Sequence, residues 1–148
     1  MIYTALTRRA MQIAMEAHRD QTDPAGFPYI MHPIMVANAQ RDERAAAAAL
    51  LHDVCEDSEI SIQDLYEFGM PEDVVQAVEA LTHRKNEPYA DYIQRVSKNK
   101  LARAVKLADL KANMDPSRLV LCDTKKRIRL QQKIAVYKLA YEKLSKAR

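Results

Sequence analysis

The sequence predicts an all-α fold, a single helical bundle formed by residues 1–148. It contains only two glycines and no tryptophan, and it is rich in alanine, leucine, methionine, lysine, arginine and glutamine, which lose little side-chain freedom in a helix. Apolar residues recur at steps of three and four, the spacing of one helical face. The chain is long enough to bury one core, and no repeat or linker divides it, so we expect one domain.

The first helix is expected over residues 6–19, because its apolar residues form one stripe. Residues 21–30 contain proline, glycine and aspartate, which favour turns, and they predict a loop. His32 follows this loop, and Pro33 suits the first turn of a second helix. Residues 44–54 are alanine-rich and end in an apolar run, which predicts a central buried helix that continues to its last residue, a valine.

The remaining helices are predicted from their start signals and their periodicity. The one over 61–68 opens with a serine and, three residues later, an aspartate, which is a capping box, and the one over 71–81 opens with a proline and two acidic residues. Periodicity predicts helices over 89–97 and 100–114, with a proline just beyond the second. The last helix starts near Asp123, and its stripe faces the core or forms a dimer seam. This stripe consists of Leu130, Ile134, Tyr137, Tyr141 and Leu144.

Charge and cysteine usage narrow the class of protein. The formal net charge is only +3, but lysine and arginine dominate from Lys98 onward, which suggests anionic partners. Cys55 and Cys122 lie far apart and are expected to be reduced thiols. Arginines occupy the region where a signal peptide needs an apolar run, and no stretch approaches the ~20 apolar residues of a membrane span. We therefore expect a cytoplasmic protein without a membrane partner.

A cluster of ionisable residues interrupts the apolar run of the central helix. His52 and Asp53 are adjacent there, and burying an ionised carboxylate without a partner costs several kcal/mol. Glu56 and Asp57 follow at helical spacing and are expected on the same face. The three carboxylates, so close together beside one imidazole, would repel one another, and a divalent cation would neutralise their charge.

Two further ionisable residues stand in apolar surroundings. His32 follows Tyr29, an isoleucine and a methionine, and Asp109 ends the segment 105–109, in which Lys106 is the other charged residue. With His52 and Asp53, His32 and Asp109 would form a mixed nitrogen and oxygen site between helices, which suits Mn²⁺, Fe²⁺, Co²⁺ or Zn²⁺ better than Ca²⁺. Basic groups such as Lys106, His83 and Arg84 are candidates to neutralise phosphate oxygens, although solvated roles are equally open.

The motifs occur together and in a fixed order. They are Ala17-His18 with Gln21, Pro28-Tyr29-Ile30-Met31-His32-Pro33-Ile34, Ala48-Ala49-Leu50-Leu51-His52-Asp53-Val54-Cys55-Glu56-Asp57, Phe68-Gly69, and Val105-Lys106-Leu107-Ala108-Asp109 with Asn113-Met114. This ordered set resembles the HD superfamily of phosphohydrolases, and within it the hydrolase domains of bifunctional alarmone synthetase-hydrolases and the small alarmone hydrolases.

The resemblance implies a metal centre, a pair of catalytic carboxylates and a nucleotide site. The implied metal is Mn²⁺ or another divalent transition metal, and the implied reaction removes the 3′-pyrophosphate from (p)ppGpp to give GDP or GTP and pyrophosphate. A metal cation lowers the pKa of a water molecule bound to it toward neutrality, and the hydroxide that forms can carry out such a hydrolysis. The implied ligands are His32, His52, Asp53 and Asp109; Glu56 and Asp57 would orient and activate water; Asn113, Lys106 and Tyr29 would contact the substrate.

Two alternatives remain open. The loop over residues 21–26 lacks the Arg-Lys pair that alarmone hydrolases usually carry there, which leaves (p)ppApp, another nucleotide or a phosphomonoester as substrate. A non-catalytic module that binds nucleic acid or a nucleotide would explain the basic carboxyl-terminal third, but no nucleic-acid motif is present and we expect no nucleic-acid partner. A homodimer is possible through the last helix.

Overall fold

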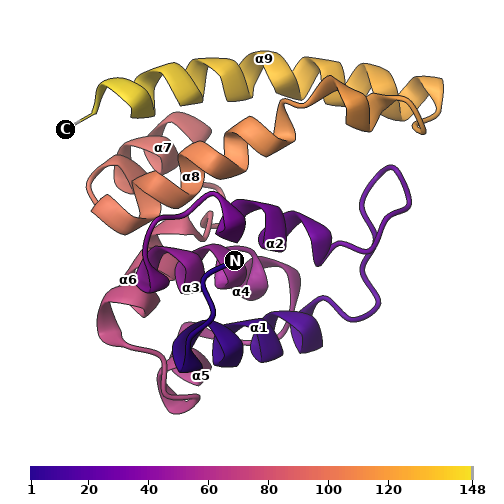
Figure 1. The fold of residues 1–148 in the computed structure, drawn as a ribbon. Helices are drawn as coiled ribbons and strands as arrows, with labels where there is room; N and C mark the ends of the chain where they lie inside the picture. The colour runs from indigo at the N-terminus through magenta and orange to yellow at the C-terminus, as the bar shows by residue number, and fades with distance from the viewer. Residues whose placement is uncertain (148) are drawn as a thin grey trace.

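The computed structural model describes residues 1–147, and the all-α prediction is confirmed for this part of the chain (Figure 1). Its only pairing of strand type in that range is an isolated bridge between Thr22 and Pro28. The elements are α1 (Ala5–Ala17), α2 (Met31–Asn38), α3 (Glu43–Leu51), α4 (Val54–Asp57), α5 (Ile62–Glu67), α6 (Glu72–Leu81), α7 (Tyr89–Ser97), α8 (Lys100–Asn113), the 3₁₀ turn η1 (Pro116–Leu119) and α9 (Thr124–Lys146).

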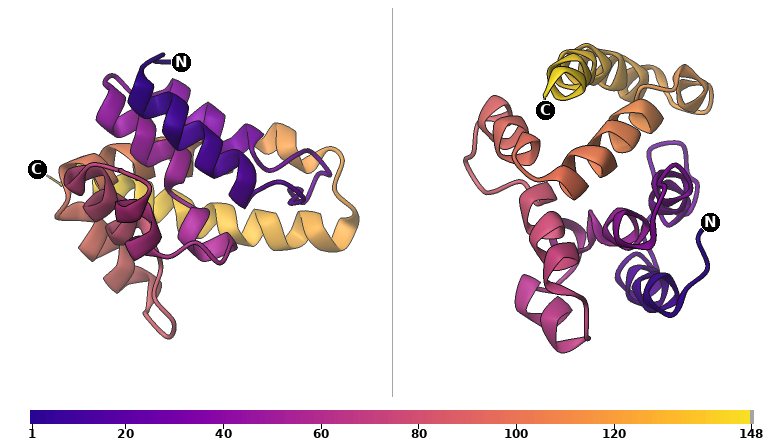
Figure 2. Two further views of the ribbon diagram at one scale, coloured as in Figure 1. Left: turned by 90° about the horizontal axis from the view of Figure 1, so that it is seen from below. Right: turned by 60° about the vertical axis from the view of Figure 1, so that its left-hand side comes forward.

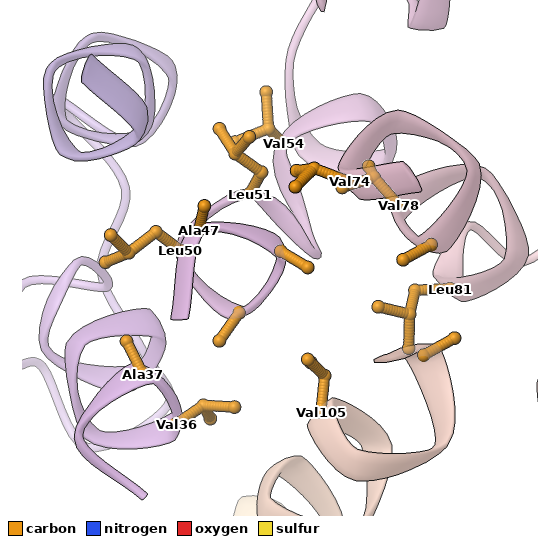
Figure 3. Packing of buried hydrophobic residues seen from close by; sticks show 14 of the residues in the cluster. Val36, Ala37, Ala47, Leu50, Leu51, Val54, Val74, Val78, Leu81 and Val105 are labelled. Atoms are coloured by element: carbon orange, nitrogen blue, oxygen red, sulfur yellow. The ribbon is translucent and has the colours of Figure 1, made fainter. Parts of the chain in front are cut away.

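Helix α3 lies at the centre of the fold, and α1, α2, α6 and α8 pack around it. Its alanines at positions 46–49 are fully buried, and their small side chains let several helices approach one axis. Figure 3 shows Leu51 at the end of α3 beside Val54 of α4 and Val74 of α6, Leu50 on the side of α2 near Ala37, and Val105 of α8 facing α3 across the core. None of the helices in residues 1–147 combines the length and apolar character that a membrane span requires.

Helix α9 lies along α8 and α7, on the side of the molecule opposite to α1 and α5 (Figures 1 and 2). Leu144 is buried, and Tyr137 and Tyr141 pack against the core, so this part of the predicted stripe faces the core. The outer face of α9 leaves apolar side chains exposed, such as Leu139.

Most helix boundaries agree with the local signals in the sequence. The predicted capping box at Ser61 is present, since its hydroxyl accepts from the backbone N–H of Asp64 and the Asp64 carboxylate accepts from the N–H of Ser61. Asp42 caps α3 and Asn99 caps α8 in the same way, through side-chain oxygens that accept backbone N–H groups.

The prediction of one continuous central helix through Val54 is wrong. Helix α3 ends at Leu51, His52 is its C-cap, and α4 begins only at Val54. The carbonyl oxygen of Ala49 accepts both the backbone N–H of His52, at 3.5 Å, and its Nδ1, at 2.6 Å. A carbonyl that accepts from the N–H group three residues ahead, rather than four, is typical of the 3₁₀ turn at the end of an α-helix. Glu56 therefore does not continue the helical face of His52.

Arg95 of α7 fixes the loop between α6 and α7. Its guanidinium donates to the carbonyl oxygens of Glu79, Ala80 and Thr82, at 3.1, 3.1 and 2.9 Å, and so satisfies the carboxyl end of α6. It also donates to both oxygens of Glu87, at 3.0 and 2.8 Å, and this contact holds the pKa of Glu87 at about 2. The loop that Arg95 holds in place carries His83 to the functional site.

Replacing Arg95 with alanine is expected to lower the free energy of unfolding by about 2 kcal/mol, because a charged donor to three backbone carbonyls is lost. Urea unfolding measures this, with Arg129→Ala on the exposed face of α9 as control. The pKa of Glu87 lies below its ordinary value of 4.5. The stabilisation that the Glu87 carboxylate gives the folded state is therefore present above pH 4.5 and is lost as the pH falls toward 2. The difference in free energy of unfolding between the unaltered protein and Arg95→Ala should therefore become smaller between pH 4.5 and pH 2. A difference that does not change with pH would contradict the role of Glu87.

Candidate metal centre

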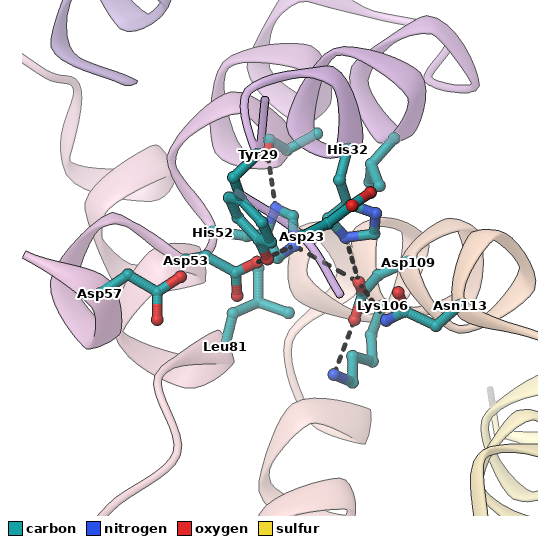
Figure 4. Close-up of polar contacts among 12 residues, drawn as sticks. Asp23, Tyr29, His32, His52, Asp53, Asp57, Leu81, Lys106, Asp109 and Asn113 are labelled. Atoms are coloured by element: carbon teal, nitrogen blue, oxygen red, sulfur yellow. Dashed lines mark hydrogen bonds and ion pairs between the residues drawn. The ribbon is translucent and has the colours of Figure 1, made fainter. Parts of the chain in front are cut away.

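Three helices bring the predicted ligands together at one buried point (Figure 4). His32 lies in the first turn of α2, His52 closes α3, and Asp109 lies in the last two turns of α8. One ligand atom from each of these three residues lies within 4.8 Å of the other two, and all three side chains are buried. The structure thus assembles three of the four predicted ligands from distant parts of the sequence.

The orientation of His52 is fixed by the backbone. Because the carbonyl of Ala49 can only accept, Nδ1 of His52 carries the proton in this bond, and Nε2 presents a lone pair in the neutral ring. This Nε2 is buried and has no partner in hydrogen-bond geometry, although it lies 3.0 Å from Oδ2 of Asp53 and 3.4 Å from Oδ1 of Asp109. A lone pair facing two carboxylates requires a proton or a cation between them. Burial lowers the pKa of His52, but these carboxylates outweigh burial and raise it well above the usual value.

Asp109 makes the most side-chain contacts of the predicted ligands. Its Oδ1 lies 2.8 Å from Nε2 of His32 and accepts Nδ2 of Asn113 at 3.0 Å, while its Oδ2 accepts Nζ of Lys106 at 2.7 Å. Burial raises the pKa of Asp109, but the ammonium of Lys106 and the two imidazoles outweigh it and hold the pKa well below the usual range. Asp109 is therefore an anion with a defined orientation.

Asp53 lies at the edge of this cluster and keeps partial solvent contact. The hydroxyl of Tyr29 donates to its Oδ2. Burial raises the pKa of Asp53, but His52 and the Tyr29 hydroxyl outweigh burial and lower it to about 2. Asp53 falls outside the tight three-residue group, so its role as the fourth ligand stays a prediction.

This donor set fits a divalent transition metal. Two imidazole nitrogens and at least one carboxylate converge in a buried space, and the orphaned Nε2 of His52 points into it. Sites of mixed nitrogen and oxygen ligands suit Mn²⁺, Fe²⁺, Co²⁺ and Zn²⁺. Lys106 and Asn113 hold Asp109 from outside the cluster, as the second layer around a metal site does.

Glu56 and Asp57 border the site from α4 and keep solvent contact. Glu56 accepts the backbone N–H of His83, and Asp57 accepts Nε2 of Gln21 at 3.2 Å. Partial burial raises the pKa of both carboxyl groups, and the charge of Asp53 contributes to both shifts. Both residues are thus held beside the centre by neighbours outside α4.

The residues predicted to contact substrate all touch carboxylates of the centre. Tyr29 donates to Asp53, and Lys106 and Asn113 donate to Asp109. Their contact with a nucleotide stays a prediction. Lys106 also lies 5.3 Å from the centre of the Tyr92 ring, and its pKa is raised well above the usual value because the charge of Asp109 outweighs the effect of burial.

Several contacts of the site were missed at the level of sequence. His83 was a candidate for phosphate binding, but it is its backbone N–H that holds Glu56. The motif that contains Gln21 does not reveal its role: its amide links Asp57 to His18, whose Nδ1 lies 2.7 Å from the Gln21 oxygen. Arg118 donates to Asn113 at 2.8 Å, and no periodicity or motif pointed to it.

The comparisons with known proteins agree on one family. A family model described as "HD domain" matches residues 10–143. The bifunctional (p)ppGpp synthase/hydrolase SpoT of Escherichia coli is 33% identical over 137 residues, which covers 82% of this chain and 19% of SpoT. The guanosine-3′,5′-bis(diphosphate) 3′-pyrophosphohydrolase MESH1 of Danio rerio is 34% identical over 125 residues, covering 75% of this chain and 68% of MESH1.

A solved structure shares the whole fold. It comes from work described as "A metazoan ortholog of SpoT hydrolyzes ppGpp and plays a role in starvation responses", and it matches with a TM-score of 0.71 and 25% identity, over 97% of this chain and 96% of that one. This chain spans about a fifth of the length of the first curated relatives, such as SpoT. The match of the family model over residues 10–143 and the His-Asp cluster show that the chain belongs to the HD domain family.

Proposed function

We propose that this chain is a metal-dependent phosphohydrolase that removes the 3′-pyrophosphate from (p)ppGpp and releases GDP or GTP. The names of its relatives, which include 3′-pyrophosphohydrolases of guanosine-3′,5′-bis(diphosphate), support this substrate. The proposed partner is the small nucleotide itself, and the proposed setting is the cytoplasm.

The observation that carries the proposal is the orphaned Nε2 of His52, which faces the carboxylates of Asp53 and Asp109 beside His32. We assign these four residues as ligands of one divalent ion, with Mn²⁺ as the first choice among metals that suit such donors. When bound, the ion would activate water and neutralise charge on the transferred phosphorus group.

The residues around the ion would orient the reaction. Glu56 and Asp57 would accept the proton of the attacking water and set its direction, because each is fixed by a donor outside α4 and keeps solvent contact. Tyr29 holds Asp53 in place through its hydroxyl. Asn113 and Lys106, both on the side of Asp109, would face the nucleotide.

A second substrate deserves direct comparison, because the loop before α2 supplies an aspartate rather than cations. Asp23 lies in that loop and pairs with Arg118, the closest atoms being 3.7 Å apart. A nucleotide with a different base, such as (p)ppApp, is the proposed alternative. A homodimer through the exposed apolar face of α9 stays a prediction.

The test is the release of pyrophosphate from ppGpp and ppApp by metal-stripped protein, before and after addition of Mn²⁺. Release from ppGpp that depends on Mn²⁺ is the expected result, and the ratio of kcat/KM for the two nucleotides ranks the bases. A clearly higher kcat/KM for ppApp would make ppApp the substrate and leave the proposed reaction unchanged. No hydrolysis of either nucleotide by protein with bound Mn²⁺ would overturn the proposed reaction.

A further inference from the structure

A hydrogen-bonded chain leads from Asp109 through Asn113 to Arg118 at the surface, and Arg118 has no role in the proposed function. Oδ1 of Asp109 accepts Nδ2 of Asn113 at 3.0 Å, and Oδ1 of Asn113 accepts Nη1 of Arg118 at 2.8 Å. Figure 4 shows Asn113 directly beside Asp109. Asn113 is at the end of α8 and Arg118 in the η1 turn, so the chain joins two elements.

Arg118 decides which way the amide of Asn113 points. A guanidinium has only donors, so the atom of Asn113 that faces it must be the oxygen. The NH₂ group then faces Asp109, where it donates to the oxygen that also lies 2.8 Å from His32. If the amide of Asn113 were reversed, its oxygen would face Oδ1 of Asp109, and Asp109 would lose the N–H group that donates to it.

Arg118 is itself held by the loop that precedes α2. Oδ1 of Asp23 accepts the backbone N–H groups of Ala25 and Phe27, at 2.9 and 3.0 Å, which fixes the carboxylate on its own loop. Its Oδ2 lies 3.7 Å from Nη2 of Arg118, whose side chain is 27% exposed. Asp23, His32 and Arg118 also line one cavity of about 180 Å³. Arg118 is therefore anchored on one side by Asp23 and on the other by Asn113.

We propose that Arg118 is a positioning residue of the metal centre, which orients Asn113 so that its amide holds Asp109 in the geometry of a metal ligand. The proposal rests on the metal centre of the proposed function but not on its substrate. Outer residues that orient metal ligands typically change metal affinity by about 10–100-fold when removed. Asn113 touches the ligand and should lie within that range, whereas Arg118 acts through Asn113 and should lie near its lower limit.

The test measures Mn²⁺ affinity without nucleotide, by calorimetry on metal-stripped protein. Arg118→Ala should weaken binding about tenfold and Asn113→Ala by at least as much. The double variant should bind Mn²⁺ no more weakly than Asn113→Ala alone, because Arg118 acts on the centre only through the side-chain amide of Asn113. Lys111→Ala, which removes an exposed cation from the same end of α8, is the matched control and should leave the affinity unchanged.

Two further variants separate positioning from folding. Arg118→Lys keeps a donor for Asn113 and should recover part of the affinity, while Arg118→Met keeps the apolar stem and should not. The visible absorption of bound Co²⁺ should change in Arg118→Met and in Asn113→Ala in the same direction, since both disturb Asp109.

Three outcomes would overturn the inference. Unchanged Mn²⁺ affinity in Arg118→Ala and Arg118→Met would show that the arginine does not act on the centre. Losses that add in the double variant would show that it acts by another route than Asn113. Failure of the unaltered protein to bind Mn²⁺ or Co²⁺ would remove the centre itself. Loss of affinity as expected, together with no hydrolysis of ppGpp, would leave the inference standing and overturn the proposed substrate.

Discussion

Replacement of Asp109 by alanine is expected to abolish metal binding and to lower kcat/KM by about 10³-fold or more. A bound metal ion contributes several kcal/mol to a transition state, and about 1.4 kcal/mol corresponds to a factor of ten. Asp109 is the carboxylate within reach of both imidazoles, at 2.8 Å from His32 and 3.4 Å from His52. Calorimetry with Mn²⁺ and the rate of pyrophosphate release from ppGpp are the two measurements.

The single variant also leaves Lys106 buried without its partner, and an uncompensated buried charge costs about 3–5 kcal/mol of stability. A double variant, Lys106→Met with Asp109→Ala, removes both charges. It should recover much of the stability but neither metal binding nor activity, which separates folding from catalysis. Activity restored in the double variant would show that Asp109 serves the ion pair alone and is not a ligand.

Glu56→Gln is expected to lower kcat by about 10²–10⁴-fold while Mn²⁺ affinity stays unchanged, because general-base catalysis supplies a factor of this size. The amide oxygen of glutamine can still accept the backbone N–H of His83, so the side chain keeps its place. Asp57→Asn tests the partner carboxylate in the same way, since its amide oxygen can still accept from Gln21.

The matched control is Glu59→Gln, which removes an exposed carboxylate from the turn that follows α4. Its kcat should equal that of the unaltered protein. A fall in Mn²⁺ affinity for Glu56→Gln would contradict the assignment, because it would make Glu56 a ligand rather than a base.

The helices were predictable because their signals are local. Ser61 and Asp64 form their capping box within three residues, the start signal at Pro71 locates α6, and apolar spacing locates α8. The grouping of His32, His52 and Asp109 was predictable for a related reason, since a histidine or aspartate in apolar sequence, such as Asp109, must find a partner when it is buried.

The break between α3 and α4 was not predictable, because it depends on a side-chain hydrogen bond that the spacing of apolar residues does not indicate. The side chain of His52 binds the carbonyl of Ala49, and both the apolar run and the alanines favour a continued helix. The contact of Arg118 with Asn113 depends on how η1 folds back after α8, and no local pattern specifies that.

The cluster of His32, His52 and Asp109 joins positions up to 77 residues apart, so it exists only when the whole bundle is folded. An ion that binds only the native chain draws the folding equilibrium toward it by mass action, by about 2.7 kcal/mol at a free metal concentration of 100 Kd. Metal supply would then set the lifetime of this protein against unfolding as well as its rate of catalysis. A cell short of the metal would hold a less active and less persistent population of the same molecule.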